Sequence, residues 1–220
     1  MKCRIWKKLH REEAGRFDQA YALMEKHPTL PLAEAFGVIQ SGMSVDDFTA
    51  RRARAKKKEE VKVARSAVTA ELVDGWIAAL IAAKTELTVV LAERTALDVI
   101  TKVEPVAFQL ERSGRLEKLQ VVALAARALW EKLSAGLTRE PKLAQKPAQV
   151  ARQPAKRPVS DPRPFLEHVG QRVELVLRNG LTLGLPLHGV GPFDLLVGES
   201  AEALVFVPLH AIVQWKALEG

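Results

Sequence analysis

The chain has 220 residues, of which 48% are hydrophobic and 27% charged, and its formal net charge is +7. The hydrophobic content is ample for folded cores, and the positive charge favours polyanionic partners because clustered Lys and Arg displace counterions from phosphates. A single cysteine, Cys3, excludes an internal disulfide and a multi-thiolate zinc site. The charged N-terminus is not typical of a signal peptide, and no apolar stretch resembles a membrane span. These features predict a soluble, cytoplasmic protein.

Residues 1–70 predict a basic helical region. Apolar spacing indicates helices at residues 11–26 and 31–40, and a third that begins at Ser44 and contains the string RRARAKKKEEVKVAR. This third helix is the most basic element of the chain, which predicts either a solvated helix or one that lies along phosphates. The candidate RNA-binding residues on it are Arg51, Arg52, Arg54, Lys56, Lys57, Lys58 and Lys62.

A second interpretation of this region is a helix-turn-helix. Residues 33–38, AEAFGV, resemble its first half, with Gly37 at the tight turn. The continuation fits less well, since Gly42 would fall inside the recognition helix and the acidic pair Asp46-Asp47 would face DNA phosphates. A DNA-binding regulator therefore stays as an alternative.

Residues 136–160 predict a disordered basic linker, because the segment lacks hydrophobic periodicity and gathers Pro, Ala, Gln and positive charge. Such a segment is a tether, and in a basic protein it is also a candidate for loose contact with a phosphate backbone. Its candidate RNA-binding residues, with one just beyond it, are Lys156, Arg157 and Arg163.

The rest of the chain contains an internal repeat. The strings KLQVVALAARALW (118–130) and ALVFVPLHAIVQW (203–215) share five identities in thirteen positions, and this register pairs Trp130 with Trp215. Upstream of each, alternating apolar residues indicate half-buried strands behind a short apolar helix. We therefore predict two units, 71–135 and 161–220, each a short helix followed by about five strands.

The C-terminal unit resembles the bacterial Sm-like RNA chaperone family, the Hfq family. The resemblance rests on Pro164-Phe-Leu166, Val173–Leu177 running into Asn179-Gly180, Phe193-Asp194, and Val207-Pro-Leu-His210. It implies an α+β fold in which the basic helical region precedes two small Sm-like five-stranded bent β-barrels, each with a short N-terminal helix. It also implies rings closed by pairing between edge strands, and RNA binding on the ring faces and rim.

The resemblance also makes His210 a candidate RNA contact. In that family a Lys-His pair helps to form a uridine pocket between neighbouring subunits. Here the histidine is His210, Leu209 stands at the lysine position, and the first repeat has Ala125 at the histidine position.

Together these features predict an oligomeric RNA-binding protein, an RNA chaperone or ribonucleoprotein component, that contacts mainly the RNA backbone. Three copies of a two-unit chain would give a six-unit ring. The alternatives are an adaptor that uses its barrels for assembly and its helical region for a protein partner, or the DNA-binding regulator. No catalytic motif, phosphate loop or metal-ligand spacing stands out, so we expect no enzyme, no cofactor and no metal site.

Overall fold

The structure, a computed structural model, describes residues 11–218 of the chain. The chain divides into two compact units, Met1–Lys57 and Lys58–Gly220, and the division falls inside helix α4 (Val45–Ser66). Cys3 and the rest of residues 1–10 in the predicted helical region lie outside the described residues. Among residues 11–218, no helix combines the length and the apolar character needed to cross a bilayer.

The first unit contains the predicted helices: α2 (Arg11–Lys26), α3 (Leu32–Ser41) and the first part of α4. The start of α4 after Ser44 is confirmed, because the Ser44 hydroxyl accepts a hydrogen bond from the Asp47 N–H at 3.1 Å and donates one to the Asp47 carboxylate at 2.7 Å. The first of these bonds satisfies one backbone N–H that the first turn leaves without an intrahelical partner, and the second holds the hydroxyl in place.

Gly37 does not form the turn that the helix-turn-helix interpretation requires. It lies within α3, and the left-handed residue that ends this helix is Gly42, with φ of 66°. A Cβ at position 37 would meet the ring of Phe48 on α4, so glycine allows the two helices to pack closely.

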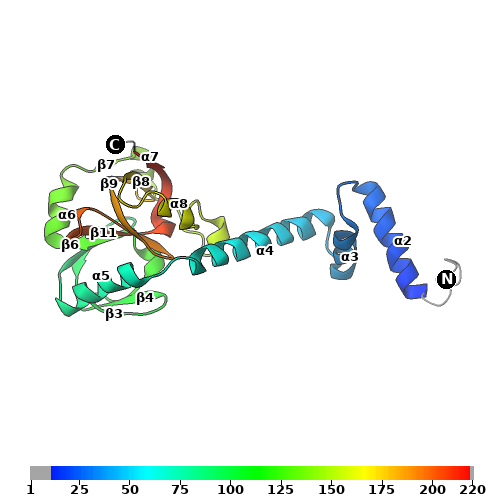
Figure 1. The fold of residues 1–220 in the computed structure, drawn as a ribbon, viewed down its shortest axis with the longest axis horizontal. Helices are drawn as coiled ribbons and strands as arrows, with labels where there is room; N and C mark the ends of the chain where they lie inside the picture. Colours follow the sequence, from blue (N-terminus) through cyan, green and yellow to red (C-terminus); the bar gives the residue numbers. More distant parts are fainter. Residues whose placement is uncertain (1–10, 219–220) are drawn as a thin grey trace. The chain divides into compact units, whose positions relative to one another are not determined.

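The second unit contains two repeats of one arrangement, separated by residues 127–162 (Figure 1). The middle repeat, residues 71–126, consists of α5 (Glu71–Ala82), β1 (Leu87–Val90), β2 (Thr95–Asp98), β3 (Ile100–Val103), β4 (Ala107–Leu110), β5 (Gly114–Glu117), the 3-10 helix η1 (Lys118–Gln120) and β6 (Ala123–Ala126). The C-terminal repeat, residues 163–217, consists of α8 (Arg163–Leu166), β8 (Arg172–Leu177), β9 (Leu181–Val190), β10 (Asp194–Ser200), β11 (Ala203–Pro208), η3 (Leu209–Ala211) and β12 (Ile212–Ala217).

The prediction of two separate five-stranded Sm-like barrels is wrong. The strands form one nine-stranded antiparallel sheet, in the order β12-β8-β9-β10-β11-β6-β1-β2 with β7 added beside β9, and a three-stranded sheet β3-β4-β5. Neither repeat closes on itself, because the second edge of β11 pairs with β6 of the middle repeat rather than with β12. Alternating burial indicates strands, but it does not specify which edges pair.

The two sheets meet at Asp98, which ends β2 just before β3 begins. Its carboxylate is fully buried and accepts hydrogen bonds from the backbone N–H groups of Val99, Arg112 and Ser113, at 2.8, 2.9 and 2.8 Å. These bonds satisfy a buried charge and hold the bend between β2 and β3.

The register of the repeat in the structure differs from the register that the identities suggest. The 3-10 helices η1 and η3 each precede the last strand of their repeat, and the first residue of each donates its N–H to a carbonyl just before β4 or β10. Lys118 is therefore equivalent to Leu209, Leu119 to His210, and Leu124 to Trp215. Trp130 has no counterpart in this register, because it lies on α6 (Arg127–Ser134) after the repeat has ended.

Two apolar cores fill the second unit, and the repeats share them. Phe206 of β11 contributes to the core of the middle repeat, where its ring stacks on Trp76 at 6.3 Å and meets the edge of Phe108 at 6.2 Å. Val90 and Val122 of the middle repeat belong in turn to the core of the C-terminal repeat. The repeats therefore form one folded body.

Residues 136–160, the predicted linker, carry short elements that contact the C-terminal repeat. They are β7 (Thr138–Arg139), α7 (Pro141–Gln145) and η2 (Pro154–Lys156). Strand β7 pairs with the start of β9, and the N–H groups of Glu140 and Ala148 each donate to carbonyls of the β8–β9 turn at 2.8 Å. These backbone hydrogen bonds connect the segment to the C-terminal repeat.

Candidate nucleic-acid interface

The most basic surface of the described chain is the middle of α4. Six of the eight residues from Arg51 to Lys58 are Arg or Lys and none is acidic, and every residue from Ala50 to Glu60 is exposed. This stretch therefore has no apolar face to bury, and its stability within the helix comes from its flanks and from helix propensity.

Two basic side chains of α4 form exposed salt bridges. Arg52 forms a salt bridge with Glu34 at 3.0 Å, and Lys62 forms one with Glu59 at 3.8 Å. Lys57 and Lys58 form no salt bridge within residues 11–218. Exposed ion pairs contribute little free energy, so Arg52 and Lys62 are able to exchange their carboxylate partners for phosphates.

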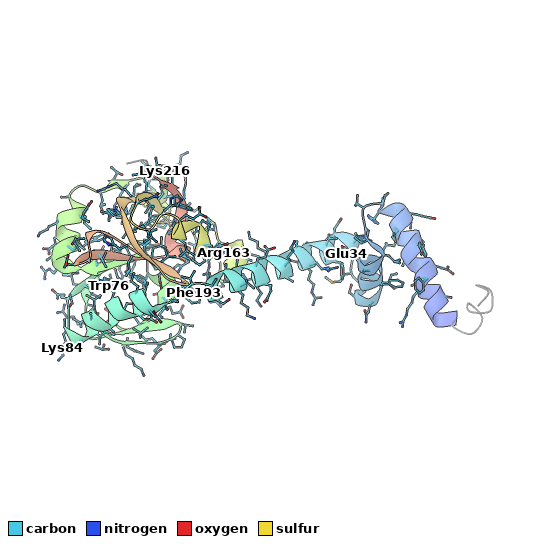
Figure 2. All side chains as sticks on the ribbon, viewed as in Figure 1. Glu34, Trp76, Lys84, Arg163, Phe193 and Lys216 are labelled. Atoms are coloured by element: carbon cyan, nitrogen blue, oxygen red, sulfur yellow. The ribbon has the colours of Figure 1, made fainter. Side chains whose placement is uncertain are left out.

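At its C-terminal end α4 meets the C-terminal repeat through Arg65. The Arg65 guanidinium lies 4.8 Å from the centre of the Phe193 ring. Phe193 is 57% exposed, and its position is labelled in Figure 2. Burial and the neighbouring charge of Arg157 lower the pKa of Arg65, which the charge of Asp161 partly offsets. An exposed ring beside a guanidinium is a surface on which a nucleobase can stack. Neither residue was among the predicted RNA contacts.

The predicted basic residues of the segment 156–163 differ in their surroundings. Lys156 is exposed. Arg157 is partly buried and donates to the carbonyl oxygens of Ala151 and Arg152 at 2.8 and 3.0 Å, so it stabilises its own loop. Arg163 binds the Asp161 carboxylate through two nitrogens, the shorter distance being 2.7 Å. Of these three residues, Lys156 is the one best placed to contact a phosphate.

His210 lies on η3 at the junction between the two repeats. Its Nε2 lies 3.1 Å from the carbonyl oxygen of Val121 in the middle repeat, which assigns this nitrogen as the donor. Burial, aided by the charges of Arg157 and Arg178, lowers the pKa of His210 to about 4. The imidazole is therefore neutral at pH 7, and in this geometry it fastens one repeat to the other.

Two residues of the β8–β9 turn also hold this junction, and neither role was predicted from the sequence. Arg178 is buried and donates to the carbonyl of Gln120 at 2.7 Å, and Asn179 donates to the carbonyl of Leu91 at 3.4 Å. Burial lowers the pKa of Arg178. The sequence shows these residues only as part of a turn before Gly180, so nothing in it indicated that they span the repeats.

Asp194, at the start of β10, is a largely buried carboxylate. Burial raises its pKa to about 7, and the positive charge of Lys118 moderates the effect while the charge of Asp74 adds to it. Its Oδ1 has no hydrogen-bond partner in the part of the chain that the structure describes. A carboxylate whose pKa is raised by burial makes folding stability depend on pH.

Comparison with known proteins gives no relative. No family model, no curated protein and no solved structure matches this chain. The resemblance to the Sm-like family therefore stays a prediction based on short sequence stretches. Across residues 11–218 no group of three His, Cys, Asp or Glu side chains is arranged to hold a metal ion.

Proposed function

We propose that this protein binds RNA through its phosphate backbone, with low sequence specificity, and that the exposed basic stretch of α4 makes the main contacts. The observation that carries this proposal is the run of six basic residues from Arg51 to Lys58 on a fully exposed part of a helix. A protein surface that offers many cations and few shape-determined pockets recognises the charge and spacing of phosphates rather than base edges.

The second unit supplies further contacts. Phe193 with Arg65 offers a stacking surface for an unpaired base, and Lys156 adds an exposed cation on η2. Stacking on an aromatic ring favours single strands, because bases in a duplex are already stacked. We therefore expect single-stranded RNA to bind more tightly than duplex DNA of the same length.

The test is the salt dependence of binding to a fluorescently labelled, unstructured RNA of about 20 nucleotides, measured by anisotropy. Replacing Lys56, Lys57 and Lys58 with Gln should weaken binding and reduce the slope of log K against log salt by about two, since each phosphate contact on a single strand contributes about 0.7. The matched control replaces three exposed cations elsewhere, Arg94, Lys102 and Lys132, and should leave the slope unchanged.

An equal loss of slope in both variants would show that net charge, and not α4, determines the binding. An unchanged slope in the α4 variant would remove the helix from the RNA interface and favour an adaptor role with a protein partner. Tighter binding of duplex DNA than of single-stranded RNA would favour the DNA-binding alternative.

A further inference from the structure

Arg178, in the turn between β8 and β9, is a buried cation that no carboxylate of the described chain balances. It is 8% exposed, and its Nη2 donates to the carbonyl oxygens of Leu119 and Gln120 at 3.5 and 2.7 Å. Within residues 11–218 it forms no salt bridge, and its buried Nε has no hydrogen-bond partner. Arginine is almost never buried without a group of opposite charge, because a charge that leaves water loses its hydration.

Arg157 is a second cation of this kind. Its Nε and Nη2 donate to the carbonyl oxygens of Ala151 and Arg152 at 2.8 and 3.0 Å, and its Nη1 makes no hydrogen bond in the described part of the chain. Burial lowers the pKa of both Arg157 and Arg178, and no carboxylate among residues 11–218 offsets this effect. Backbone carbonyls thus solvate these two guanidiniums without neutralising them.

Arg65, near the end of α4, adds a third positive charge. Its Nε is buried and has no hydrogen-bond partner among the described residues. The charge of Asp161 partly offsets the effects that lower the pKa of Arg65, but Arg163 already binds the Asp161 carboxylate at 2.7 Å. One carboxylate that Arg163 holds does not balance Arg65, Arg157 and Arg178 together.

Backbone contacts bring Arg178 and the segment that carries Arg157 to the same junction. The Arg178 N–H donates to the carbonyl oxygen of Ala211 on η3 at 2.8 Å. The Arg178 carbonyl oxygen accepts a hydrogen bond from the Ala148 N–H, also at 2.8 Å. Residues 148–157 therefore begin at the β8–β9 turn and carry Arg157 on their return towards α8.

The charges of the three arginines act on common neighbours. Together with burial, the charges of Arg157 and Arg178 lower the pKa of His210, and the charge of Arg157 also lowers the pKa of Arg65. His210 is neutral at pH 7, so it neither adds to this positive charge nor cancels it. Three guanidiniums therefore gather around one uncharged imidazole.

We propose that a phosphate group binds among Arg65, Arg157 and Arg178 and balances their charge. A phosphate is a tetrahedral oxyanion with more acceptor oxygens than a carboxylate, so it accepts hydrogen bonds from several guanidiniums at once. The expected donors are the nitrogens that have no partner within residues 11–218, namely Nε of Arg65, Nε of Arg178 and Nη1 of Arg157. The bound group joins the end of α4, the segment before α8 and the β8–β9 turn in one ion-pair network.

This site is separate from the exposed basic stretch of α4, since none of its residues lies between Arg51 and Lys58. It therefore does not depend on RNA binding by that stretch. The same chemistry has two sources, a phosphodiester of an RNA backbone and free phosphate, and the experiment has one arm for each.

The first arm measures thermal unfolding at pH 7 with increasing inorganic phosphate, while potassium chloride keeps the ionic strength constant. Tryptophan fluorescence reports on the second unit, which contains Trp76, Trp130 and Trp215. With a dissociation constant of about 1 mM, about 10 mM phosphate should raise Tm by about 3–5 °C, and the rise should saturate. Arg157→Gln and, separately, Arg65→Gln should each raise the half-saturating phosphate concentration about tenfold or more.

The matched control is Arg94→Gln, which removes an exposed arginine and should keep the wild-type response to phosphate. Circular dichroism shows whether each variant is folded, and Arg65→Gln carries the test if Arg157→Gln is not. A rise in Tm that does not saturate, or that is equal in wild type, Arg157→Gln and Arg65→Gln, would overturn the proposal, because anions then act on the whole surface.

The second arm measures binding of the labelled RNA of about 20 nucleotides. If an RNA phosphodiester occupies the site, Arg157→Gln should reduce the slope of log K against log salt by about 0.7 relative to Arg94→Gln. Equal slopes, with a saturating response to inorganic phosphate, assign the site to free phosphate. The Lys56, Lys57 and Lys58 variant should respond to inorganic phosphate as wild type does, so failure of the α4 proposal and failure of this one give different results.

Discussion

The buried groups His210 and Asp194 should make opposite contributions to the pH dependence of stability. Burial lowers the pKa of His210 from 6.5 to about 4, so its stabilising contribution is present above pH 6.5 and lost as the pH falls towards 4. Burial raises the pKa of Asp194 from 3.8 to about 7, so its contribution is complete below pH 3.8 and lost as the pH rises towards 7. Between pH 4 and 6.5 the two effects largely cancel.

A variant that lacks one of the two groups should show the pH dependence of stability that the other group causes. His210→Gln keeps a donor near the Val121 carbonyl but does not titrate, so its stability should fall relative to wild type as the pH rises from 4 to 6.5. A shift of about 2.5 pKa units corresponds to about 3 kcal/mol over this range. Asp194→Asn should show the reverse trend, with a relative gain of similar size as the pH rises.

The measurement is urea denaturation followed by tryptophan fluorescence at half-unit steps from pH 4 to 8. The double variant His210→Gln/Asp194→Asn is the control, and its stability difference from wild type should vary little with pH in the window where the effects cancel. Stability curves for wild type and both single variants that run parallel would show that the two groups titrate normally, and would refute the argument from burial.

Three further substitutions test packing. Phe206→Ala should lower the free energy of unfolding of the second unit by about 3–5 kcal/mol, because it removes the ring that packs on Trp76 and Phe108, and calorimetry would detect it. Gly37→Ala should destabilise the first unit by about 1–3 kcal/mol, because the new methyl group meets the Phe48 ring. Gly15→Ala on α2, where nothing lies near the new methyl group, should instead stabilise by about 0.5–1 kcal/mol, and a loss of stability there would contradict the packing argument.

The local elements of this protein follow from its sequence. The three N-terminal helices lie where periodicity predicts them. Ser44 caps α4 because its hydroxyl accepts a hydrogen bond from the backbone N–H of Asp47, three residues further along the chain, and this contact needs no other part of the fold. The exposed charge of α4 is equally a local property, since six cations among eight residues leave no apolar face to bury. The alternation of apolar residues likewise determines that both repeats form strands.

Only the tertiary structure determines how those strands pair and which of the candidate RNA-binding side chains are exposed to solvent. A strand edge offers the same N–H and C=O groups to any partner, so sequence does not reveal that β11 joins β6 rather than closing its own repeat. The same long-range pairing places the Val121 carbonyl beside His210 and buries the imidazole. Because burial keeps the imidazole neutral at pH 7, it serves as a hydrogen-bond donor that holds the two repeats together. The sequence makes both His210 and Lys57 candidate RNA contacts. In the fold His210 is buried at the junction between the repeats, whereas Lys57 is an exposed cation. The sequence does not show this difference, because burial depends on residues that are distant along the chain.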